Sequence, residues 1–358
     1  MEHKLSRRGF LVTTAGVAAA NRYLFPQQRV QRPLQPVKVL EGRSAVALVH
    51  GDSRRKNIAD ALSAIEDRIL PVLKQKKYVV IKPNIVNTVN QLASTHADAL
   101  HGIIDFLAPR FKGPVIIAES SAGYTWEGYE NFSYTKVASE RKSQQVSLID
   151  LNEEGKYEAI QVLDGDLHPV PTRLAARLLE PDAYIICSGI MKTHNVVVAT
   201  LSIKNMALGA PLHNARKESK RWNDKRNYHG GVRQTHYDIL LTAQKLQPFW
   251  GATVIDGFEG MEGNGPNSGQ PVPSRIAIAS TDYVAADRVG VEAMGINPEW
   301  VGYLSYCGQC GLGQNDLSKI DIRGARLADV VRKYQLHPDM ELELQWIGPM
   351  TEVPRRLG

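Results

Sequence analysis

Residues 78–84 read YVVIKPN, in which four aromatic or β-branched residues are followed by a lysine, a proline and an asparagine. Similar short apolar runs recur along the chain and alternate with longer segments of helical periodicity. Near-continuous apolar strands separated by helices predict an α/β fold, with a mostly parallel sheet covered by helices on both faces. The predicted strands are 45–49, 78–81, 115–118, 146–149, 183–186, 253–255 and 276–279, and the predicted helices are 58–73, 97–107, 174–179, 234–246 and 283–294.

Charged or glycine-rich residues follow five of these predicted strands, namely those that end at residues 81, 118, 186, 255 and 279. In parallel α/β sheets, ligands bind outside the carboxyl ends of the strands. We therefore expect one shared cleft built from distant parts of the chain. The residues predicted to line it are Lys82, Asn84, Glu119, Lys192, His194, Lys204, Asn205, Asp256, Glu259 and Glu262.

The lysines of this set allow two interpretations. Buried lysines cost free energy unless they are paired, so lysines near strand ends suggest an anionic ligand. Alternatively, Lys82 and Lys204 form internal bridges with Glu119 or Asp256. In the first interpretation, Lys82, Asn84, Glu119, Lys204 and Asn205 bind substrate, and the catalytic candidates are Lys192, His194, Asp256 and Glu262.

Three acids recur every third residue, at Asp256, Glu259 and Glu262, in a glycine-rich segment predicted to be a loop. Such acids could converge on a hard divalent cation such as Mg²⁺ or Ca²⁺, which takes oxygen ligands. Alternatively, the glycines present backbone N–H groups to an anion while one carboxylate acts as a general base. Further along, Asp282 is predicted to cap a helix, and Asp287 to face the cleft or a lysine.

The N-terminus carries the run SRRGFL at residues 6–11, followed by a mildly apolar stretch that ends in three alanines at 18–20. Paired arginines before a short apolar run and small residues are typical of a twin-arginine export signal. The run is too short to span a membrane, so no transmembrane anchor is expected. The sequence predicts a signal peptide over 1–20, a linker over 21–41, the twin-arginine export machinery as a partner, and a periplasmic or extracellular location.

The composition bears on three further possibilities, namely a disulfide framework, redox thiols and nucleic-acid binding. The 358 residues carry a net charge of +6 and three cysteines, too few for a disulfide framework. Cys307 and Cys310 could form a disulfide, act as a redox dithiol or remain free thiols. The basic run at 216–226 contains one tryptophan and is interpreted as a solvated loop. It lies within a polar stretch, 214–231, that is predicted to be a long loop or an inserted excursion. No nucleic-acid partner is expected.

Several motifs together resemble one known family. They are KPNIV at 82–86, MKTHNVVVATLSIKNMALG at 191–209, VIDGFEGMEGNGPNSGQPV at 254–272 and ASTDYVAADRVGVEAMG at 279–295. With these motifs in this order along the sequence, the chain resembles the domain of unknown function 362 family. The resemblance implies a domain over 42–325 and a C-terminal extension over 326–358. Some members carry a ferredoxin-like iron–sulfur segment. Three cysteines cannot build that module, so no iron–sulfur cluster is expected in this chain.

Three functions are compatible with these patterns. The first is an exported enzyme that acts on a small anionic substrate, with lysines binding the substrate and His194 or a carboxylate moving protons. The second is an extracytoplasmic protein that binds an anion or a metal without chemistry. The third is a redox or metallocentre-handling protein related to the iron–sulfur members of the family.

Overall fold

The computed structural model describes residues 42–140, 144–214 and 222–347. All of them belong to one unit of the chain, Val39–Gly358. The predicted signal peptide and linker, residues 1–41, lie outside the described residues. Among the helices that are described, none combines the length and the apolar character needed to cross a membrane.

A mixed sheet of ten strands forms the centre of the described structure, in the order β12-β1-β11-β9-β7-β2-β3-β4. All neighbours along this path are parallel except β11, which runs antiparallel to β1 and β9. Two short strands, β8 and β10, form hairpins with β7 and β9, and β5 and β6 form a separate hairpin. The bounds are β1 Ser44–His50, β2 Tyr78–Lys82, β3 Val115–Glu119, β4 Val146–Asp150, β5 Tyr157–Leu163, β6 Pro169–Ala175, β7 Ala183–His194, β8 Val198–Thr200, β9 Trp250–Glu262, β10 Gln270–Val272, β11 Ile276–Ser280 and β12 Ile320–Gly324.

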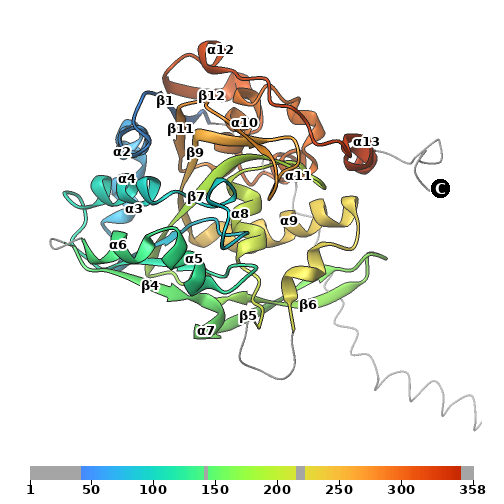
Figure 1. Cartoon of the computed structure of the whole chain (residues 1–358), viewed down its shortest axis with the longest axis horizontal. Coiled ribbons are helices and arrows are strands. Elements are labelled where there is room, and N and C mark those ends of the chain that lie inside the picture. Colours follow the sequence, from blue (N-terminus) through green and yellow to red (C-terminus); the bar gives the residue numbers. More distant parts are fainter. Residues whose placement is uncertain (1–41, 141–143, 215–221, 348–358) are drawn as a thin grey trace, which may run out of the picture. The chain divides into compact units, whose positions relative to one another are not determined.

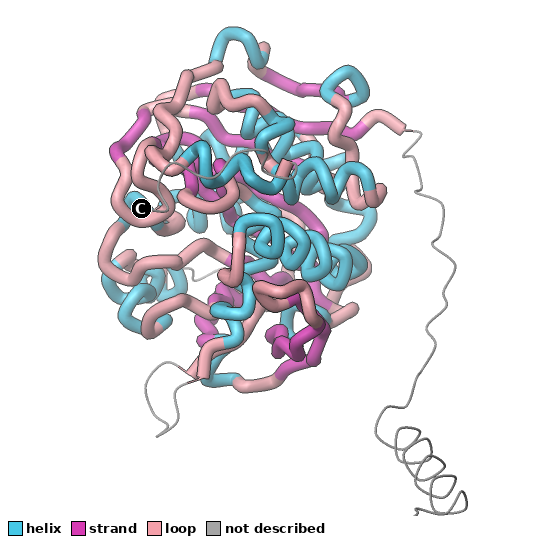
Figure 2. Tube along the Cα trace, turned by 90° about the vertical axis from the view of Figure 1, so that its right-hand side faces the viewer, coloured by secondary structure: helices cyan, strands magenta, loops and turns pink. Residues whose placement is uncertain are grey.

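Helices cover both faces of this sheet, which confirms the predicted α/β fold (Figure 1). One core lies under α2, α3, α4 and α6, and the other under α8, α9, α10 and α11. Figure 2 shows the helices of the second side in front of the strands. The α-helices are α2 Arg54–Ala64, α3 Glu66–Leu73, α4 Ala97–Leu107, α5 Thr125–Asn131, α6 Tyr134–Ser139, α7 Leu151–Glu154, α8 Ser202–Gly209, α9 Val232–Leu246, α10 Tyr283–Ala293, α11 Gly302–Gln309, α12 Leu327–Val330 and α13 Met340–Glu343. The 3₁₀ helices are η1 Gln91–Ala93, η2 Ala176–Leu179, η3 Asp224–Tyr228, η4 Gln247–Phe249, η5 Pro298–Trp300, η6 Leu317–Lys319 and η7 Leu344–Trp346.

The alternation of side chains along β2 determines which face Lys82 occupies. Val79 and Ile81 pack in the core under α2 to α4, whereas Val80 packs in the core on the α8 side. Successive side chains of a strand point to opposite faces, so Lys82 follows Val80 onto the α8 side. The same strand therefore builds one core with its odd residues and delivers a lysine to the other face at its carboxyl end.

Several predicted elements differ from the structure. The helix predicted over 58–73 is two helices that meet at Ile65, and residues 174–179 are the end of β6 followed by η2. Strand β7 continues through His194, because β2, β9 and β8 pair with it along its length. Because β11 is antiparallel, its carboxyl end at Ser280 lies beside Thr253, at the edge of the sheet opposite to the predicted cleft.

Candidate functional site

A pocket of about 370 Å³ lies at the carboxyl ends of β2, β3 and β7. Lys82, Glu119 and His194, the last residues of these strands, all line it. Three strand ends that the sequence pattern singled out therefore meet at one pocket. Its described lining consists of Lys82, Asn84, Ile85, Val86, Glu119, Ser120, Ala122, Lys192, His194, Asn195, Val196, Thr200, Lys204, Asn205, Leu208, Gly209, Asn223, Lys225, Arg226, His229, Pro266 and Asn267.

The innermost cation, Lys82, is fully buried and paired. Its Nζ donates to Glu119 Oε1 at 2.9 Å and Oε2 at 3.1 Å, and also to Asn205 Oδ1 at 3.1 Å. Glu119 also accepts the backbone N–H groups of Ile85 and Ser120, so both of its oxygens are satisfied. A Cβ at position 209 would collide with the end of the Lys82 side chain, so Gly209 leaves the space that this lysine occupies. The internal bridge predicted between Lys82 and Glu119 is present.

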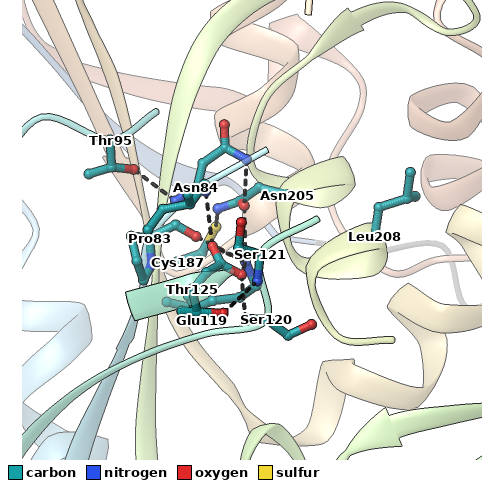
Figure 3. A network of polar contacts seen from close by, with 12 residues as sticks. Pro83, Asn84, Thr95, Glu119, Ser120, Ser121, Thr125, Cys187, Asn205 and Leu208 are labelled. Atoms are coloured by element: carbon teal, nitrogen blue, oxygen red, sulfur yellow. Dashed lines mark hydrogen bonds and ion pairs between the residues drawn. The ribbon is translucent and has the colours of Figure 1, made fainter. Parts of the chain in front are cut away.

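Two asparagines connect Lys82 to a second lysine. Asn84 Nδ2 donates to Asn205 Oδ1 at 3.2 Å, and Asn84 Oδ1 accepts from Lys192 Nζ at 2.8 Å. Lys192 Nζ also donates to the carbonyl oxygen of Ala93 at 2.8 Å. Figure 3 shows Asn84, from the loop after β2, facing Asn205 on α8, with Glu119 nearby. Both hydrogen-bond partners of Lys192 are neutral, and burial together with the nearby Lys204 ammonium holds the pKa of Lys192 well below its ordinary value.

Lys204 lies on α8 and has a different environment. It is 7% exposed and, within the described part of the chain, makes neither a hydrogen bond nor an ion pair. Burial lowers the pKa of Lys204 to about 7. The helix that carries it is fixed by Asp287 on α10, which accepts the N–H groups of Ser202 at 2.9 Å and Ile203 at 3.0 Å. Asp287 thus caps α8, and does not face the cleft or a lysine as predicted.

His194 ends β7 at a tight turn into β8. Its Nδ1 accepts the backbone N–H of Val196 at 3.0 Å, and burial holds the pKa of His194 well below its ordinary value. A neutral imidazole that accepts at Nδ1 carries its proton on Nε2. His194 is therefore a neutral donor in the lining. The turn is strained, since Val198 has a φ of 68°, in the left-handed region that β-branched residues rarely adopt.

Sequence reasoning missed the residues that η3 contributes to the pocket. Lys225 is 8% exposed, its Nζ donates to the carbonyl oxygen of Leu208 at 2.9 Å, and burial lowers its pKa to about 7. Its neighbour Asp224 holds η3 in place through a bidentate contact with Arg173 at 2.7 and 2.8 Å. These residues lie in the stretch interpreted as a solvated loop. That interpretation is wrong for Asp224 and Lys225, which are buried, and their polar sequence neighbours gave no sign of this burial.

The acids of the DGFEGMEG segment do not line the pocket. Asp256 is buried and lies 3.0 Å from Arg54 Nε, and burial raises the pKa of Asp256 despite this guanidinium. Glu262 accepts the backbone N–H of Gln335, and Glu259 is exposed. The segment predicted to be a loop is the end of β9, which paired strands keep extended, so each carboxylate has separate surroundings. The segment after it contributes Pro266 and Asn267 to the lining instead.

One other group of possible metal ligands occurs among the described residues, at the β5–β6 turn. It consists of Asp164, Asp166 and His168, and it is exposed or half-buried. Asp164 Oδ1 already accepts the N–H groups of Asp166 and His168, which accounts for the clustering as a turn. Cys307 is buried and Cys310 is exposed, and neither forms a disulfide in the structure. Neither feature points to a cofactor.

The pocket combines an excess of cationic groups with a deficit of counter-charge. Lys192, Lys204 and Lys225 have no carboxylate partner among the described residues that line it, and Glu119 is already bound by Lys82. Burying a cation without a counter-charge is unfavourable, and part of that cost appears here as lowered lysine pKa values. An anion placed among these groups would remove the cost.

The fold and this pocket define an α/β protein with a mostly parallel sheet and buried lysines at its carboxyl edge. The chain belongs to the family described as "Domain of unknown function (DUF362)", whose sequence model matches residues 79–292. This match confirms the family resemblance and includes every strand end that lines the pocket. No match was found among curated proteins.

One solved structure, the crystal structure of a protein from Thermotoga maritima, is similar to this chain at 11% identity and a TM-score of 0.39. The alignment covers 60% of this chain and 52% of the other, so the chain spans about half the length of the structure that it matches.

Proposed function

We propose that this protein binds a small anion in the pocket at the carboxyl ends of β2, β3 and β7. The observation that carries the proposal is Lys204, a buried lysine in the lining with no hydrogen bond and no carboxylate partner among the described residues. A structural lysine is held like Lys82, which has a buried carboxylate. Lys204 lacks such a partner, and a bound anion would provide one.

Native mass spectrometry of the protein purified from the exported fraction tests this proposal, because it detects a retained ligand or metal directly. We expect a retained anion, or binding of added phosphate, sulfate or carboxylates by calorimetry. Lys204→Met should lose this binding while the fold is kept. Lys74→Met, which removes an exposed lysine outside the lining, is the matched control. Equal anion affinity in both variants and the wild type would contradict the proposal.

A second function, proton transfer on the bound anion, is favoured by the surroundings of Lys192. A neutral amine has two N–H bonds and one lone pair. Lys192 directs its donors at Asn84 and Ala93, which leaves the lone pair to accept a proton. Burial and Lys204 favour this neutral form by lowering its pKa, as general bases require.

Deuterium exchange separates this activity from binding alone. A retained organic anion would be incubated with the protein in D₂O, and NMR would follow loss of a C–H signal as Lys192 removes a proton and returns a deuteron. We expect exchange with the wild type and none with Lys192→Met, which should still bind the anion. Exchange that is equally fast in both proteins would exclude Lys192 as the base.

We also propose that the protein acts outside the cytoplasm after export through the twin-arginine machinery. The support is the SRRGFL run at 6–11, followed by a short apolar stretch and small residues. A divalent metal remains an alternative ligand of the protein, although the acids predicted to hold it, Asp256, Glu259 and Glu262, lie apart from the pocket lining. Elemental analysis of the exported protein tests that alternative.

A further inference from the structure

The buried lining of the pocket is rich in lysine, whereas several of its partly exposed lining residues are apolar. Lys82, Lys192 and His194 are 0%, 2% and 4% exposed and form its floor together with Lys204. The partly exposed lining residues include four apolar side chains, listed here: Val86, Val196, Leu208 and Pro266. Ordinary protein surfaces place charges outward and apolar groups inward. A ligand that covers both layers would pair with the buried cations and shield these apolar side chains from water.

Helix α8 spans both layers of this arrangement. Lys204 and Leu208 are four residues apart, so they lie on the same face of the helix, with their Cβ atoms about 6 Å apart. Both line the pocket. Figure 3 shows Leu208 set apart from the polar network around Asn84 and Asn205. A ligand that contacts Lys204 with an anionic group would therefore contact Leu208 with whatever part follows that group.

We propose that the ligand is an organic anion that enters head first, with a carboxylate or phosphate group on the cationic floor and an apolar portion against Val86, Val196, Leu208 and Pro266. This inference rests on the proposed anion binding and specifies its substrate class. Inorganic phosphate or sulfate would fill only the floor of a cavity of about 370 Å³, a volume in the range typical of organic ligands. The polar mouth residues Asn195, Arg226 and Asn267 leave one side of the ligand open to hydrogen bonding.

Paired probes test the proposal by calorimetry on the full chain at constant pH and ionic strength. One pair is inorganic phosphate and phenyl phosphate, and the other is acetate and hexanoate. We expect the organic or longer member of at least one pair to bind more tightly, by about fourfold in Kd for each methylene buried. The pair with the larger effect identifies the head group as phosphate or carboxylate.

Two variants at the mouth of the pocket and one control variant elsewhere make the test specific to the mouth. Leu208→Asn should reduce the preference for the larger probe, and Val86→Thr should do so to a smaller extent. Leu342→Asn makes the same chemical change at an exposed site outside the lining and should leave the preference unchanged. Thermal unfolding of each variant establishes that it is folded, and Val86→Thr keeps the test valid if Leu208→Asn does not fold.

The outcomes distinguish failure of the organic-anion inference from failure of anion binding itself. If phosphate and acetate bind as tightly as their larger partners and the two variants at the mouth change nothing, the organic-anion inference is overturned while anion binding stands. If no probe binds and native mass spectrometry finds no retained anion, the proposed function itself is overturned. A preference for the larger probe that is lost in Leu208→Asn and kept in Leu342→Asn supports both.

Discussion

Lys82 Nζ lies 2.9 Å from Glu119 Oε1, and the two side chains are almost completely buried. This pair differs from Lys204, which lines the same pocket without a carboxylate among the described residues. One lysine of the pocket is thus neutralised by the fold, and another is left for a ligand. The contrast allows stability and binding to be tested on separate residues.

Glu119→Gln should destabilise the protein strongly. The variant leaves the Lys82 ammonium buried without a counter-charge, which costs about 3–5 kcal/mol in the free energy of unfolding. Asp182→Asn removes the partner of Lys77 in an exposed pair and should cost about 0–1 kcal/mol. Urea unfolding at neutral pH measures both. Similar small losses in the two variants would mean that Lys82 does not depend on Glu119.

Lys204 should make stability depend on pH. Its pKa is about 7 in the folded protein against an ordinary 10.5, so between these values the unfolded chain binds more protons. Stability should therefore rise with pH from about 7 to 10, by at most about 1.4 kcal/mol per unit for this group. Lys204→Met should show a shallower rise and be at least as stable as the wild type at pH 7.

The pKa of Lys225 is also lowered to about 7, so part of the rise of stability with pH should remain in Lys204→Met. Lys192, His194 and His229 lie near Lys204, and besides burial the Lys204 charge lowers the pKa of each of them. Lys74→Met, at an exposed position, should keep the full wild-type slope. An identical slope in Lys204→Met and the wild type would contradict the assignment of a buried, unpaired cation.

His194 should be a neutral Nε2–H tautomer at pH 6.5. Its Nδ1 accepts from Val196 N–H, and burial and the nearby Lys204 charge hold its pKa well below 6.5. ¹⁵N NMR distinguishes the tautomers by the chemical shifts of the two ring nitrogens, and His194→Gln identifies the resonance. A doubly protonated ring at pH 6.5 in the ligand-free protein would be incompatible with this geometry.

Asp287→Ala should weaken both stability and anion binding. Removing the carboxylate leaves the N-terminal N–H groups of α8 without their acceptor, and loss of a helix cap costs about 0.5–2 kcal/mol. Because α8 carries Lys204 and Asn205, its displacement should also raise the Kd for the anion. The direction of both effects is measured by thermal unfolding and calorimetry on the same preparation.

Asp282→Ala provides the matched control for that experiment. Asp282 caps α10 by accepting the N–H groups of Val284 and Ala285, and it lies outside the pocket lining. A comparable loss of stability with unchanged anion affinity is expected. If Asp282→Ala weakens binding as much as Asp287→Ala, the effect reflects global destabilisation and not the position of α8.

Replacing Arg7 and Arg8 by lysine should leave the protein in the cytoplasm. The twin-arginine route depends on the paired arginines before the apolar run, and lysines keep the charge of that region. Cell fractionation followed by immunodetection measures the distribution. Unchanged export of the double variant would remove the twin-arginine assignment and leave other secretion routes to consider.

The order of apolar runs and polar strand ends was sufficient to predict the α/β fold and much of the pocket. Lys82 and Glu119 end buried strands and Lys192 lies near the end of a third, and these parallel strands bring their carboxyl ends to one edge. The motif at 202–209 likewise contributed Lys204 and Asn205, although the sequence pattern did not predict its helix. These features are local, so a single sequence contains them.

Long-range pairing decided which charges share the pocket. Asp256 follows an apolar run much as Glu119 does, but its carboxylate meets Arg54, a partner about two hundred residues away. Lys225 lies among polar residues and is nevertheless buried, because the pairing of Asp224 with Arg173 holds η3 against β6. Local periodicity reports which residues prefer burial, whereas the balance of charge in a pocket depends on contacts between distant segments, which only the tertiary structure establishes.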